Sequence, residues 1–419
     1  MSNQNNQLFD VIVVGGGHSG ALQTLLLAQG GVKVVCIDSA DSATLSDPDQ
    51  DVRTTAISYG SHQLMRAAGI WNDFLPYACP IDDIQILDGT SPVLLDFNMR
   101  DMREEVKDEG AAFGWIIENH IIHKILHQAL KNESNARHIT KTTVVDFKVS
   151  DNDVTAKLSS GEEVMASLVI GADGRQSFTR EWMGVGAKQW SYHQQAVVCA
   201  VTHSKPHNNI AVEHFKSEGP FAVLPMLDDK NGNHRSSIVW SQHGKNTKNV
   251  LSYDDETFLI ALNNLFPDFY GEVTKAENRF AYPLNLIHAY NYIKPRMALI
   301  ADAAHGIHPI AGQGLNLGLR DVAALSEILI DAKNNAEDIG SISVLKKYQH
   351  ARRTDNILMA VTTDLLNKLF SNNLYSVALI RKAGLKIVSR LKPAKKFFMR
   401  QAMGASGHLP DMIRQGKIK

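Results

Sequence analysis

The start of the chain shows two apolar runs separated by a helical segment. Residues 9–14 (FDVIVV) and 32–37 (VKVVCI) are short and mostly apolar, which is typical of strands buried in a sheet. Residues 21–29 between them have the composition of a helix, and Gly30 and Gly31 would end it. The order strand, helix, strand predicts a βαβ unit and therefore parallel strands.

Residues 297–329 also predict a strand followed by a helix, with a loop between them. Met297 to Ile300 is an apolar run long enough for a buried strand, and Asp302 follows at its carboxyl end. A loop containing Pro309, Gly312 and Gly314 comes next. Beyond it, apolar residues recur at helical spacing, at positions 315, 319, 322, 323 and 329. Open α/β sheets bind ligands beyond the carboxyl ends of their strands, so this loop is a candidate binding site.

The middle of the chain is richer in strand patterns. Residues 81–97 alternate around a Gly-Thr-Ser-Pro turn, which is a hairpin pattern. Further strands are predicted at 144–149, 154–158, 168–171, 196–202, 211–215, 221–225 and 236–240. Helices are predicted at 61–68, 121–131, 258–266 and 348–370. We interpret 190–244 as a second, mostly antiparallel sheet, which the chain enters early through the hairpin.

Composition and charge narrow the class of protein. The chain has 419 residues, 44% hydrophobic and 21% charged, as expected of a soluble globular protein large enough for two domains. Its formal net charge of −1 gives no case for nucleic acid as a partner. We find neither an apolar run of about 18 residues nor a signal-peptide pattern. Three widely spaced cysteines form no zinc pattern, so we expect no metal and a cytoplasmic location.

The turn after the first strand carries a nucleotide-binding pattern. Residues 15–20 read GGGHSG and satisfy G-x-G-x-x-G between a strand and a helix. We expect Gly15 to allow the tight turn, Gly17 to let a pyrophosphate approach, and Gly20 to let helix and strand pack closely. Asp38 ends the second strand and would bind ribose hydroxyls, which argues against a βαβ unit without nucleotide. The candidate contacts are Gly15, Gly17, His18, Ser19, Gly20 and Asp38.

The start of the helix near Leu315 is the second candidate cofactor site. Glycines before it permit backbone angles and close approaches that a Cβ would forbid. The free N–H groups of a helix start suit an anion, or a ring that becomes one. A glycine-rich turn before an ordinary core helix is the alternative. The candidates are Asp302, Pro309, Gly312, Gln313, Gly314, Leu315 and Asn316.

Three polar positions elsewhere could also reach a cofactor. Arg53 lies in a polar loop, where a cofactor contact and a solvated charge are both open. Asn119 lies just before the helix predicted from residue 121. Asp173 and the glycine after it follow a strand and usually mark only a turn, but Arg175 and Arg180 beyond them favour a phosphate contact.

Together these motifs resemble the FAD-dependent aromatic hydroxylases of ubiquinone biosynthesis, a branch of the single-component flavoprotein monooxygenases with a para-hydroxybenzoate hydroxylase-like fold. Residues 15–20 match the first family motif, and Asp173-Gly174 the second, which serves both FAD and NAD(P)H. Residues 302–305 (DAAH) and 308–321 (HPIAGQGLNLGLRD) match the third. Other matches are Asp51-x-Arg53, Gly219-Pro220-Phe221, Leu224-Pro225, Phe398-Met399-Arg400 and Met403-Gly404. The family has Gly where this chain has Ala301, and we expect the extra methyl to crowd the ribityl chain of the cofactor.

The resemblance implies an α/β fold. A Rossmann-like βαβ domain for FAD would be interleaved with a mostly antiparallel substrate sheet and followed by a helical C-terminus. The predicted boundaries are 1–75, 99–185 and 276–345 for the FAD domain, 76–98 and 186–275 for the substrate domain, and 346–419 for the basic C-terminal segment.

The resemblance also implies a reaction. NAD(P)H, a transient co-substrate, would reduce FAD, and O2 would then form a flavin C4a-hydroperoxide that hydroxylates the ring of a polyprenylated phenol. The flavin carries this chemistry, so no nucleophile or metal is needed. The second sheet would wall the ring site and exclude water. The ring-site candidates are Phe221, Pro225, His308 and Pro309; His305 and His308 could act as bases or be packed loop histidines.

Three alternatives compete with this hypothesis. A soluble catabolic hydroxylase would convert short phenols or hydroxybenzoates with the same flavin chemistry. A flavin dehydrogenase or reductase would incorporate no oxygen. A dinucleotide-binding module would bind the cofactor without consuming NAD(P)H.

The C-terminal part differs from the rest in charge. Between Asp364 and Asp411 there is no acidic residue, and apolar residues at 377, 380, 387, 388 and 391 fall near one helical face. The nine basic residues there are Lys368, Arg381, Lys382, Lys386, Arg390, Lys392, Lys395, Lys396 and Arg400. A helix lying on an anionic membrane and a basic helix packed on the body both fit this pattern. A peripheral position on the inner face of the membrane and a complex with other ubiquinone-biosynthesis proteins are therefore both open.

Overall fold

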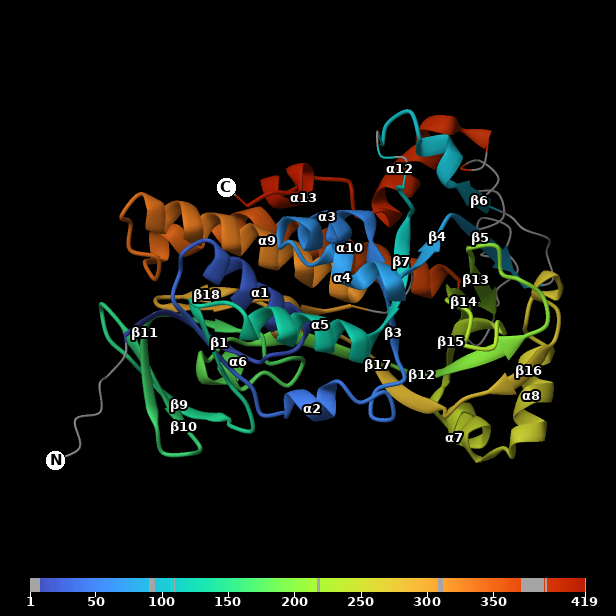
Figure 1. Cartoon of the computed structure of the whole chain (residues 1–419), viewed down its shortest axis with the longest axis horizontal. Helices are drawn as coiled ribbons and strands as arrows, with labels where there is room; N and C mark the ends of the chain where they lie inside the picture. Colours follow the sequence, from blue (N-terminus) through green and yellow to red (C-terminus); the bar gives the residue numbers. More distant parts are fainter. Residues whose placement is uncertain are drawn as a thin grey trace.

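The computed structural model describes residues 8–89, 95–106, 108, 110–216, 219–307, 312–370, 388 and 390–418. Among the residues singled out above, His308, Pro309, Arg381, Lys382 and Lys386 lie outside the described residues. Figure 1 shows the two main parts: a sheet covered by long helices, and a large twisted sheet with two short helices at its far end.

A parallel sheet forms the core of the first part. Its five parallel strands run in the order β19 (Met297–Leu299), β11 (Glu163–Gly171), β1 (Phe9–Val14), β2 (Val34–Ile37) and β8 (Ala136–Ile139). The antiparallel strands β18 (Ile293–Lys294), β10 (Val154–Leu158) and β9 (Val144–Val149) extend it. The central strands β1 and β2, and the strand β19, are apolar and almost wholly buried, as strands with helices on their faces must be.

Helix α1 (His18–Gln29) is buried nearly all round. It contacts both α5 (Asn119–Lys131) and α9 (Gln313–Asn334), so it has no solvent face and no amphipathic pattern. Helix α9 in turn contacts α10 (Ile342–Phe370), which lies beside it in Figure 1. The short helices α2 (Ser42–Leu45), α3 (Tyr59–Ala67), α4 (Trp71–Phe74) and α6 (Phe178–Trp182) complete this part.

The second sheet is mostly antiparallel. Its order is β20 (His305–Gly306), β17 (Phe280–Ala289), β12 (Ala187–His203), β15 (His234–His243), β14 (Gly219–Met226), β13 (Ile210–Lys216), β5 (Asp83–Asp88) and β6 (Leu95–Asn98), with β16 (Val273–Ala276) on β12. Helices α7 (Gly244–Ser252) and α8 (Asp255–Asn263) cover one face. The other face meets a three-stranded sheet of β3 (Thr54–Ser58), β7 (Gly114–Glu118) and β4 (Cys79–Ile81).

The predicted fold class is confirmed: a βαβ unit with a parallel sheet, a mostly antiparallel second sheet and a helical C-terminus. The hairpin at 81–97 does join the second sheet, as β5 and β6. The domain boundaries stay a prediction; the second sheet itself runs on through β17 to Ala289. Strands β3 and β7 and helix α7 were missed. Strand β3 is short and polar and α7 has few apolar residues, so both give weak periodic patterns. Strand β7 is a short apolar run directly before a helix, and such a run cannot be told from the start of that helix by periodicity.

The C-terminal helix α12 (Lys392–Ala402) is packed on the body. Met399 on it and Met403 directly after it are fully buried in the cluster between the sheets. Its basic side chains pair with acids near the short helix η2 (Met99–Met102): Lys395 with Asp101 at 2.7 Å, Lys396 with Glu105 at 3.0 Å and Arg400 with Glu105 at 2.6 Å. For this helix the structure therefore favours packing over a free membrane-binding face. Helix α13 (Asp411–Gln415) follows, and no described helix is long and apolar enough to cross a membrane.

Ala301 occupies a backbone conformation that normally requires glycine. Its φ is 51°, in the left-handed region that costs a residue with a Cβ roughly 1 kcal/mol or more. A Cβ added at Gly318 of α9 would lie 2.7 Å from the Cβ of Ala301 and 3.3 Å from Oγ of Ser19. The methyl of Ala301 faces α9, where Gly318 leaves room for it. Crowding of the ribityl chain stays a prediction.

We predict that Gly318→Ala destabilises the apoprotein by about 1–3 kcal/mol, because overpacking strains both helix α9 and the turn at Ala301. Ala301→Gly in the same chain should restore most of the loss by removing the opposing methyl. Urea unfolding of the single and double variants measures the coupling. Gly314→Ala in the same helix is the matched control, since a Cβ there meets no atom within 4 Å; equal costs at the two glycines would contradict the argument.

Candidate functional site

Four strand ends of the parallel sheet line up in one row. Ile37, Val14, Gly171 and Leu299 are register partners on adjacent strands. The predicted motifs follow directly: Asp38 after β2, the glycine turn after β1, Asp173 after β11 and Asp302 after β19. Motifs far apart in the sequence therefore meet at the edge where α/β sheets bind ligands.

The glycine turn is as tight as the sequence predicted. Gly15 has a φ of 99°, and a Cβ on it would lie 2.5 Å from the carbonyl oxygen of Ala172. A Cβ on Gly20 would lie 1.8 Å from the carbonyl oxygen of Gly15, so only glycine lets α1 pack this close to the turn. Gly17, in contrast, caps α1 with no side-chain hydrogen bond, and a Cβ there would meet nothing within 4 Å. The N-cap position of α1 thus leaves room for another group beside the helix start.

Asp38 is hydrogen-bonded to the glycine turn. Its carboxylate accepts hydrogen bonds from the backbone N–H of Gly16 at 2.6 Å and of Ala40 at 2.8 Å, and the residue is buried. Each carboxylate oxygen has a second lone pair, so ribose hydroxyls can still donate to it.

A row of four histidines lies behind this turn, a feature that the sequence analysis missed. The ring of His18 lies 4.1 Å from that of His123, and His127 follows at 5.9 Å from His123 and His138 at 5.0 Å from His127. Nε2 of His127 lies 3.2 Å from the carbonyl oxygen of Gly16. Each ring keeps one buried nitrogen without a hydrogen-bond partner. Burial lowers the pKa of His18 to about 4 and that of His123 to about 2, and it lowers the pKa of His138 as well.

The start of α9 is built like the start of α1. Gly312 caps it in the left-handed conformation with a φ of 62°, no side chain caps it, and a Cβ at Gly314 would meet nothing within 4 Å. Asn316, one turn into the helix, is hydrogen-bonded to β3 through both ends of its side-chain amide. Its amide nitrogen donates to the carbonyl oxygen of Ala56, and its oxygen accepts from the backbone N–H of Ser58 at 2.9 Å. The side chain of Asn316 is therefore engaged by β3, and its backbone, like those of Gly314 and Leu315, lies in the first turn facing the loop.

Gln313 ties the same helix start to the C-terminus. Its side chain donates to the carbonyl oxygen of Ala402 at 3.4 Å, at the end of α12. Gly60 of α3 donates to Met403 at 2.9 Å. The family-like ending at 398–404 thus packs beside the candidate site.

The second and third motifs are joined by an ion pair. Nε of Arg175 lies 3.2 Å from Oδ2 of Asp302, and both side chains are partly exposed. Asp173 has a different role: it accepts from Ser177 and from Thr179 at 2.5 to 2.9 Å and so holds the start of α6. Arg180 is also used internally, donating to the carbonyl oxygen of Ala303 at 2.8 Å. Arg175 and Arg180 therefore both contact the third motif, Arg175 through the side chain of Asp302 and Arg180 through the backbone of Ala303.

Arg53 is part of a polar cluster rather than a lone charge. It forms a bidentate ion pair with Asp51 at 2.6 and 2.7 Å and lies 4.9 Å from the ring centre of Tyr282. Asn119 donates to Asp51 at 3.1 Å and accepts from Thr55 at 2.6 Å. Burial opposes ionisation of Asp51, but the hydrogen bonds from Arg53 outweigh it, and the pKa of Asp51 is lowered. Asp51, Arg53 and Asn119 therefore act as one unit beside His18.

A buried carboxylate holds the third motif in place, and the sequence analysis assigned it no role. Asp321 is fully buried and accepts from the backbone N–H of Ala301 at 3.1 Å, from Arg352 at 2.9 Å and from Asn356 at 3.0 Å. It also pairs with Nε2 of His305. Burial disfavours the charge, but His305 and Arg352 overcome it and lower the pKa of Asp321. His305 is thus a packed loop histidine, not a base poised at an open site.

The predicted ring site is only partly supported by the fold. Phe221 is fully buried in the cluster under α7 and α8, and its place in the ring-site wall stays a prediction. Alternation along β14 puts Pro225 on the same side as Phe221. Leu224 on the opposite face packs toward Ala56 of β3, which a Cβ at Gly312 would meet at 3.1 Å. Leu224 is therefore a further candidate for the wall of the ring site.

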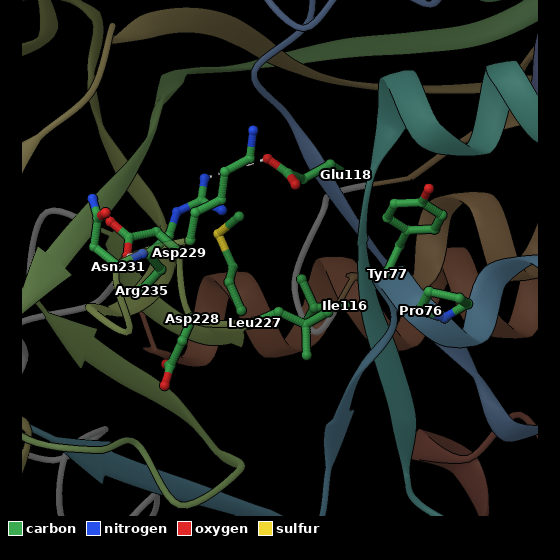
Figure 2. A pocket seen from close by; sticks show the side chains of 11 residues that line it. Pro76, Tyr77, Ile116, Glu118, Leu227, Asp228, Asp229, Asn231 and Arg235 are labelled. Atoms are coloured by element: carbon green, nitrogen blue, oxygen red, sulfur yellow. Dashed lines mark hydrogen bonds and ion pairs between the residues drawn. The ribbon is translucent and has the colours of Figure 1, made fainter.

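A cavity of about 610 Å³ lies at the seam between the two parts. Figure 2 shows Tyr77 on one side of it and Arg235 and Asn231 on the other. Its lining includes the apolar Pro76, Ile116, Met226 and Leu227, and Arg235 pairs with Glu118 at 3.4 Å. None of the residues proposed from the sequence lines it. Such seams commonly hold ligands, so this cavity is a candidate for substrate rather than nucleotide.

The donor set fits a dinucleotide with a planar ring at its end. Two uncapped helix starts, α1 and α9, both present N–H groups beside glycines with open space around them. The close contact of Gly318 with Ala301 and Ser19 brings these helix starts together. No cluster of metal-binding side chains occurs among the described residues. The two helix starts offer backbone N–H donors and helix dipoles to a ligand.

We predict that the apoprotein loses stability as the pH falls from about 6.5 toward 4. An unfolded histidine takes up a proton near pH 6.5, whereas His18, His123 and His138 resist protonation in the folded protein. The folded pKa is lowered, so the free energy of unfolding is constant above this window and falls below it, by up to about 1.4 kcal/mol per pH unit for each such histidine. Urea unfolding at a series of pH values measures this slope.

His123→Phe should make that slope shallower, because it removes one buried titrating ring while keeping an aromatic contact with His18. His408→Phe, at an exposed position, is the matched control and should leave the slope unchanged. A wild-type slope in the His123→Phe variant would show that the row does not resist protonation.

Comparison with known proteins identifies the family of the chain. The family described as "FAD binding domain" matches residues 9–360. The chain is 39% identical over 413 residues to ubiquinone hydroxylase UbiL of Rhodospirillum rubrum, covering 98% of this chain and 94% of that protein. It is 32% identical to 3-demethoxyubiquinol 3-hydroxylase of Escherichia coli, covering 95% and 99%. The crystal structure of p-nitrophenol 4-monooxygenase PnpA from Pseudomonas putida has the same fold, with a TM-score of 0.78 at 18% identity over 96% and 100% of the chains.

The strand-end motifs, the two uncapped helix starts and the full-length similarity agree on one conclusion: the chain belongs to the FAD-binding family of aromatic-ring monooxygenases that includes the ubiquinone hydroxylases.

Proposed function

We propose that this protein hydroxylates the aromatic ring of a polyprenylated phenol in ubiquinone biosynthesis, using FAD, NAD(P)H and O2. The observation that supports this most is the meeting of the fingerprint and the 302–321 motif at Ser19, Ala301 and Gly318. The similarity to ubiquinone hydroxylases over nearly the whole chain supports the substrate class.

Named residues would hold the cofactor. The N–H groups of Gly17, His18 and Ser19 would take the pyrophosphate, with Asp38 on the ribose. The N–H groups of Gly314, Leu315 and Asn316 would face the polar edge of the ring, where the helix dipole favours negative charge. FAD, when bound, supplies the transfer of electrons from NAD(P)H and the activation of O2.

The chain itself would bind and orient the phenol and keep water out of the site. Asn316 joins the start of α9 to β3 by hydrogen bonds. These bonds would hold the two elements at a fixed distance on either side of the ring site. The apolar face of the second sheet, with Leu224 and Ala56, would exclude water from the reacting ring. The cavity lined by Ile116 and Met226 offers apolar surface for a bulky substituent of the phenol.

We expect the purified protein to be yellow and to release FAD on heating. Asp302→Ala should weaken FAD binding about ten- to a hundredfold, the effect of losing a charged hydrogen-bond partner worth about 1–3 kcal/mol. Fluorescence titration of the apoprotein with FAD measures this. Asp101→Ala, which removes a carboxylate of similar exposure paired with Lys395, is the matched control; equal FAD affinity in both variants would exclude a role for Asp302.

The reaction is tested with a short-chain phenol in detergent under ¹⁸O2. We expect NAD(P)H-dependent formation of a hydroxylated ring that carries one ¹⁸O atom, detected by mass spectrometry. NAD(P)H oxidation with hydrogen peroxide as the sole product would favour a reductase or dehydrogenase. Faster turnover of unsubstituted hydroxybenzoates than of prenylated phenols would favour a catabolic hydroxylase.

A further inference from the structure

Strand β13 places a carboxylate on an apolar face of the second sheet. Glu213 is the register partner of Ala222 on β14 and of Ile86 on β5. Partners on adjacent strands project from the same face, so Glu213 shares its face with these two apolar residues. Val212 and Val223, one position away on the two strands, lie on the other face, in the cluster under α7 and α8. The pleat of β13 therefore turns Glu213 away from α7 and α8.

The face that carries Glu213 meets the start of α9. Ala211, two residues before Glu213, belongs to one apolar cluster with Leu224 of β14 and Ala56 of β3. A Cβ at Gly312, the N-cap of α9, would lie 3.1 Å from the Cβ of Ala56. Glu213 is thus on the same face as Leu224, the wall that would enclose the reacting ring.

The carboxylate of Glu213 has no hydrogen-bond or ion-pair partner among the residues that the structure describes. Loss of water alone raises the pKa of this carboxyl to about 7. An unpaired carboxylate on an apolar face is unfavourable for folding, because its charge gives up water and gains no partner. Positions of this kind are candidates for contact with a ligand, which can supply the missing partner.

The charged and titratable groups of the neighbouring elements are Asp88 on β5, Tyr59 of α3, Arg235 on β15 and the basic residues of α12. Arg235 is paired with Glu118 and Glu277, and the α12 residues Lys395, Lys396 and Arg400 are paired with Asp101 and Glu105. None of them contributes to the pKa shift of Glu213. The carboxyl is therefore left to a ligand.

The surroundings of Glu213 select the chemistry of that ligand. A carboxylate accepts hydrogen bonds and repels anions, so the ligand group next to it is a neutral donor. Ala222 and Ile86 on either side suit a flat apolar body. Glu213 is also only partly buried, so a ligand can reach it. A phenol, with its O–H on an aromatic ring, has both properties.

We propose that the carboxylate of Glu213 accepts a hydrogen bond from the hydroxyl of the phenol and takes its proton as the ring is hydroxylated. This inference rests on the proposed function, which supplies the phenol. The O–H bond breaks, the proton passes to a carboxylate oxygen of Glu213, and the electron pair stays on the phenol oxygen, where it makes the ring more electron-rich.

The same carboxyl group is restored at the end of the reaction. The second oxygen atom of O2 leaves as water and takes up the hydrogen that the ring carbon loses as a proton. Glu213 then returns its own proton to the phenol oxygen. A general base is most effective when its pKa lies near the working pH, which the desolvated carboxyl of Glu213 satisfies.

Binding of a phenol and of its methyl ether tests the contact without turnover. The holoprotein, without NAD(P)H, is dialysed to equilibrium against a short-chain prenylphenol in detergent, and against the same molecule with its hydroxyl methylated. We expect the wild type to prefer the phenol about tenfold or more, because the ether cannot donate to the carboxylate. Glu213→Leu, which suits the apolar face, should bind both ligands equally. A preference that persists in this variant would overturn the proposal.

Glu213→Gln keeps the size of the side chain and removes the base. We expect kcat for ¹⁸O incorporation to fall about a hundredfold or more, with little change in KM. In the wild type, kcat should fall as the pH drops below about 7, because a protonated carboxyl cannot take a proton. A wild-type kcat that is constant across this range would contradict the role of a base.

A fluorinated phenol that is already ionised at the working pH needs no base. Its rate in Glu213→Gln should therefore be close to its rate in the wild type. An equal loss of rate with the fluorinated and the ordinary phenol would indicate a structural role and overturn the proposal.

Glu256→Gln is the matched control, because it makes the same change at an exposed position of α8, on the other side of the same sheet. It should keep the wild-type kcat and pH profile. If Glu213→Gln behaves like Glu256→Gln, Glu213 takes no proton from the phenol.

The two kinds of measurement separate this proposal from the proposed function. If the wild type hydroxylates the phenol but binds the phenol and the ether alike, the role of Glu213 is wrong and the function stands. If the preference for the phenol is lost in Glu213→Leu but no phenol is hydroxylated, the function is wrong and the contact with Glu213 stands.

Discussion

The buried carboxylate of Asp321 is the constraint on which the candidate site depends. A charge taken out of water is tolerated only when it is paired and fully hydrogen-bonded, and Asp321 has partners on three sides. Through the N–H of Ala301 and the ring of His305 it fixes both ends of the DAAH segment. Through Arg352 and Asn356 it joins α9 to α10. Because Asp321 holds Ala301 and His305, it also fixes the position of Asp302 between them and of the ion pair that Asp302 forms with Arg175.

Close approach is the second constraint. Gly20 lets α1 press on the turn at Gly15, and Gly318 lets α9 press on Ala301 near Ser19. These two contacts bring the N-terminal ends of two helices to the same edge of the parallel sheet. Both ends lack side-chain caps, so the N–H groups that a cap would satisfy remain for a ligand. A fold that spans some 300 residues of sequence thus places two small anion-binding elements side by side.

Much of this could be predicted from the sequence, because the motifs act through local backbone geometry. The turn at Gly15, the placement of Asp38 and Asp302 at strand ends and the start of α9 depend on short segments whose patterns are visible in one chain. The role of Asp321 could not be predicted, since Arg352 and Asn356 come 31 and 35 residues later with no pattern to link them. The histidine row could not be predicted either, because its four residues come together only through tertiary contacts.

Phe221 illustrates a different limit. Alternation along β14 shows that the strand has two faces, but only the packing of α7 and α8 decides which face is turned from the parallel sheet. The C-terminal basic segment was ambiguous for a similar reason: its charges are visible in the sequence, but the acids that bind Lys395, Lys396 and Arg400 lie about 290 residues earlier.

The central claim is that the uncapped starts of α1 and α9 form one FAD site. A crystal structure of the holoprotein tests it most directly. The account predicts the pyrophosphate at the N–H groups of Gly17, His18 and Ser19 and the ring at those of Gly314, Leu315 and Asn316. FAD bound with its ring away from α9, for example in the cavity beside Ile116 and Arg235, would contradict it.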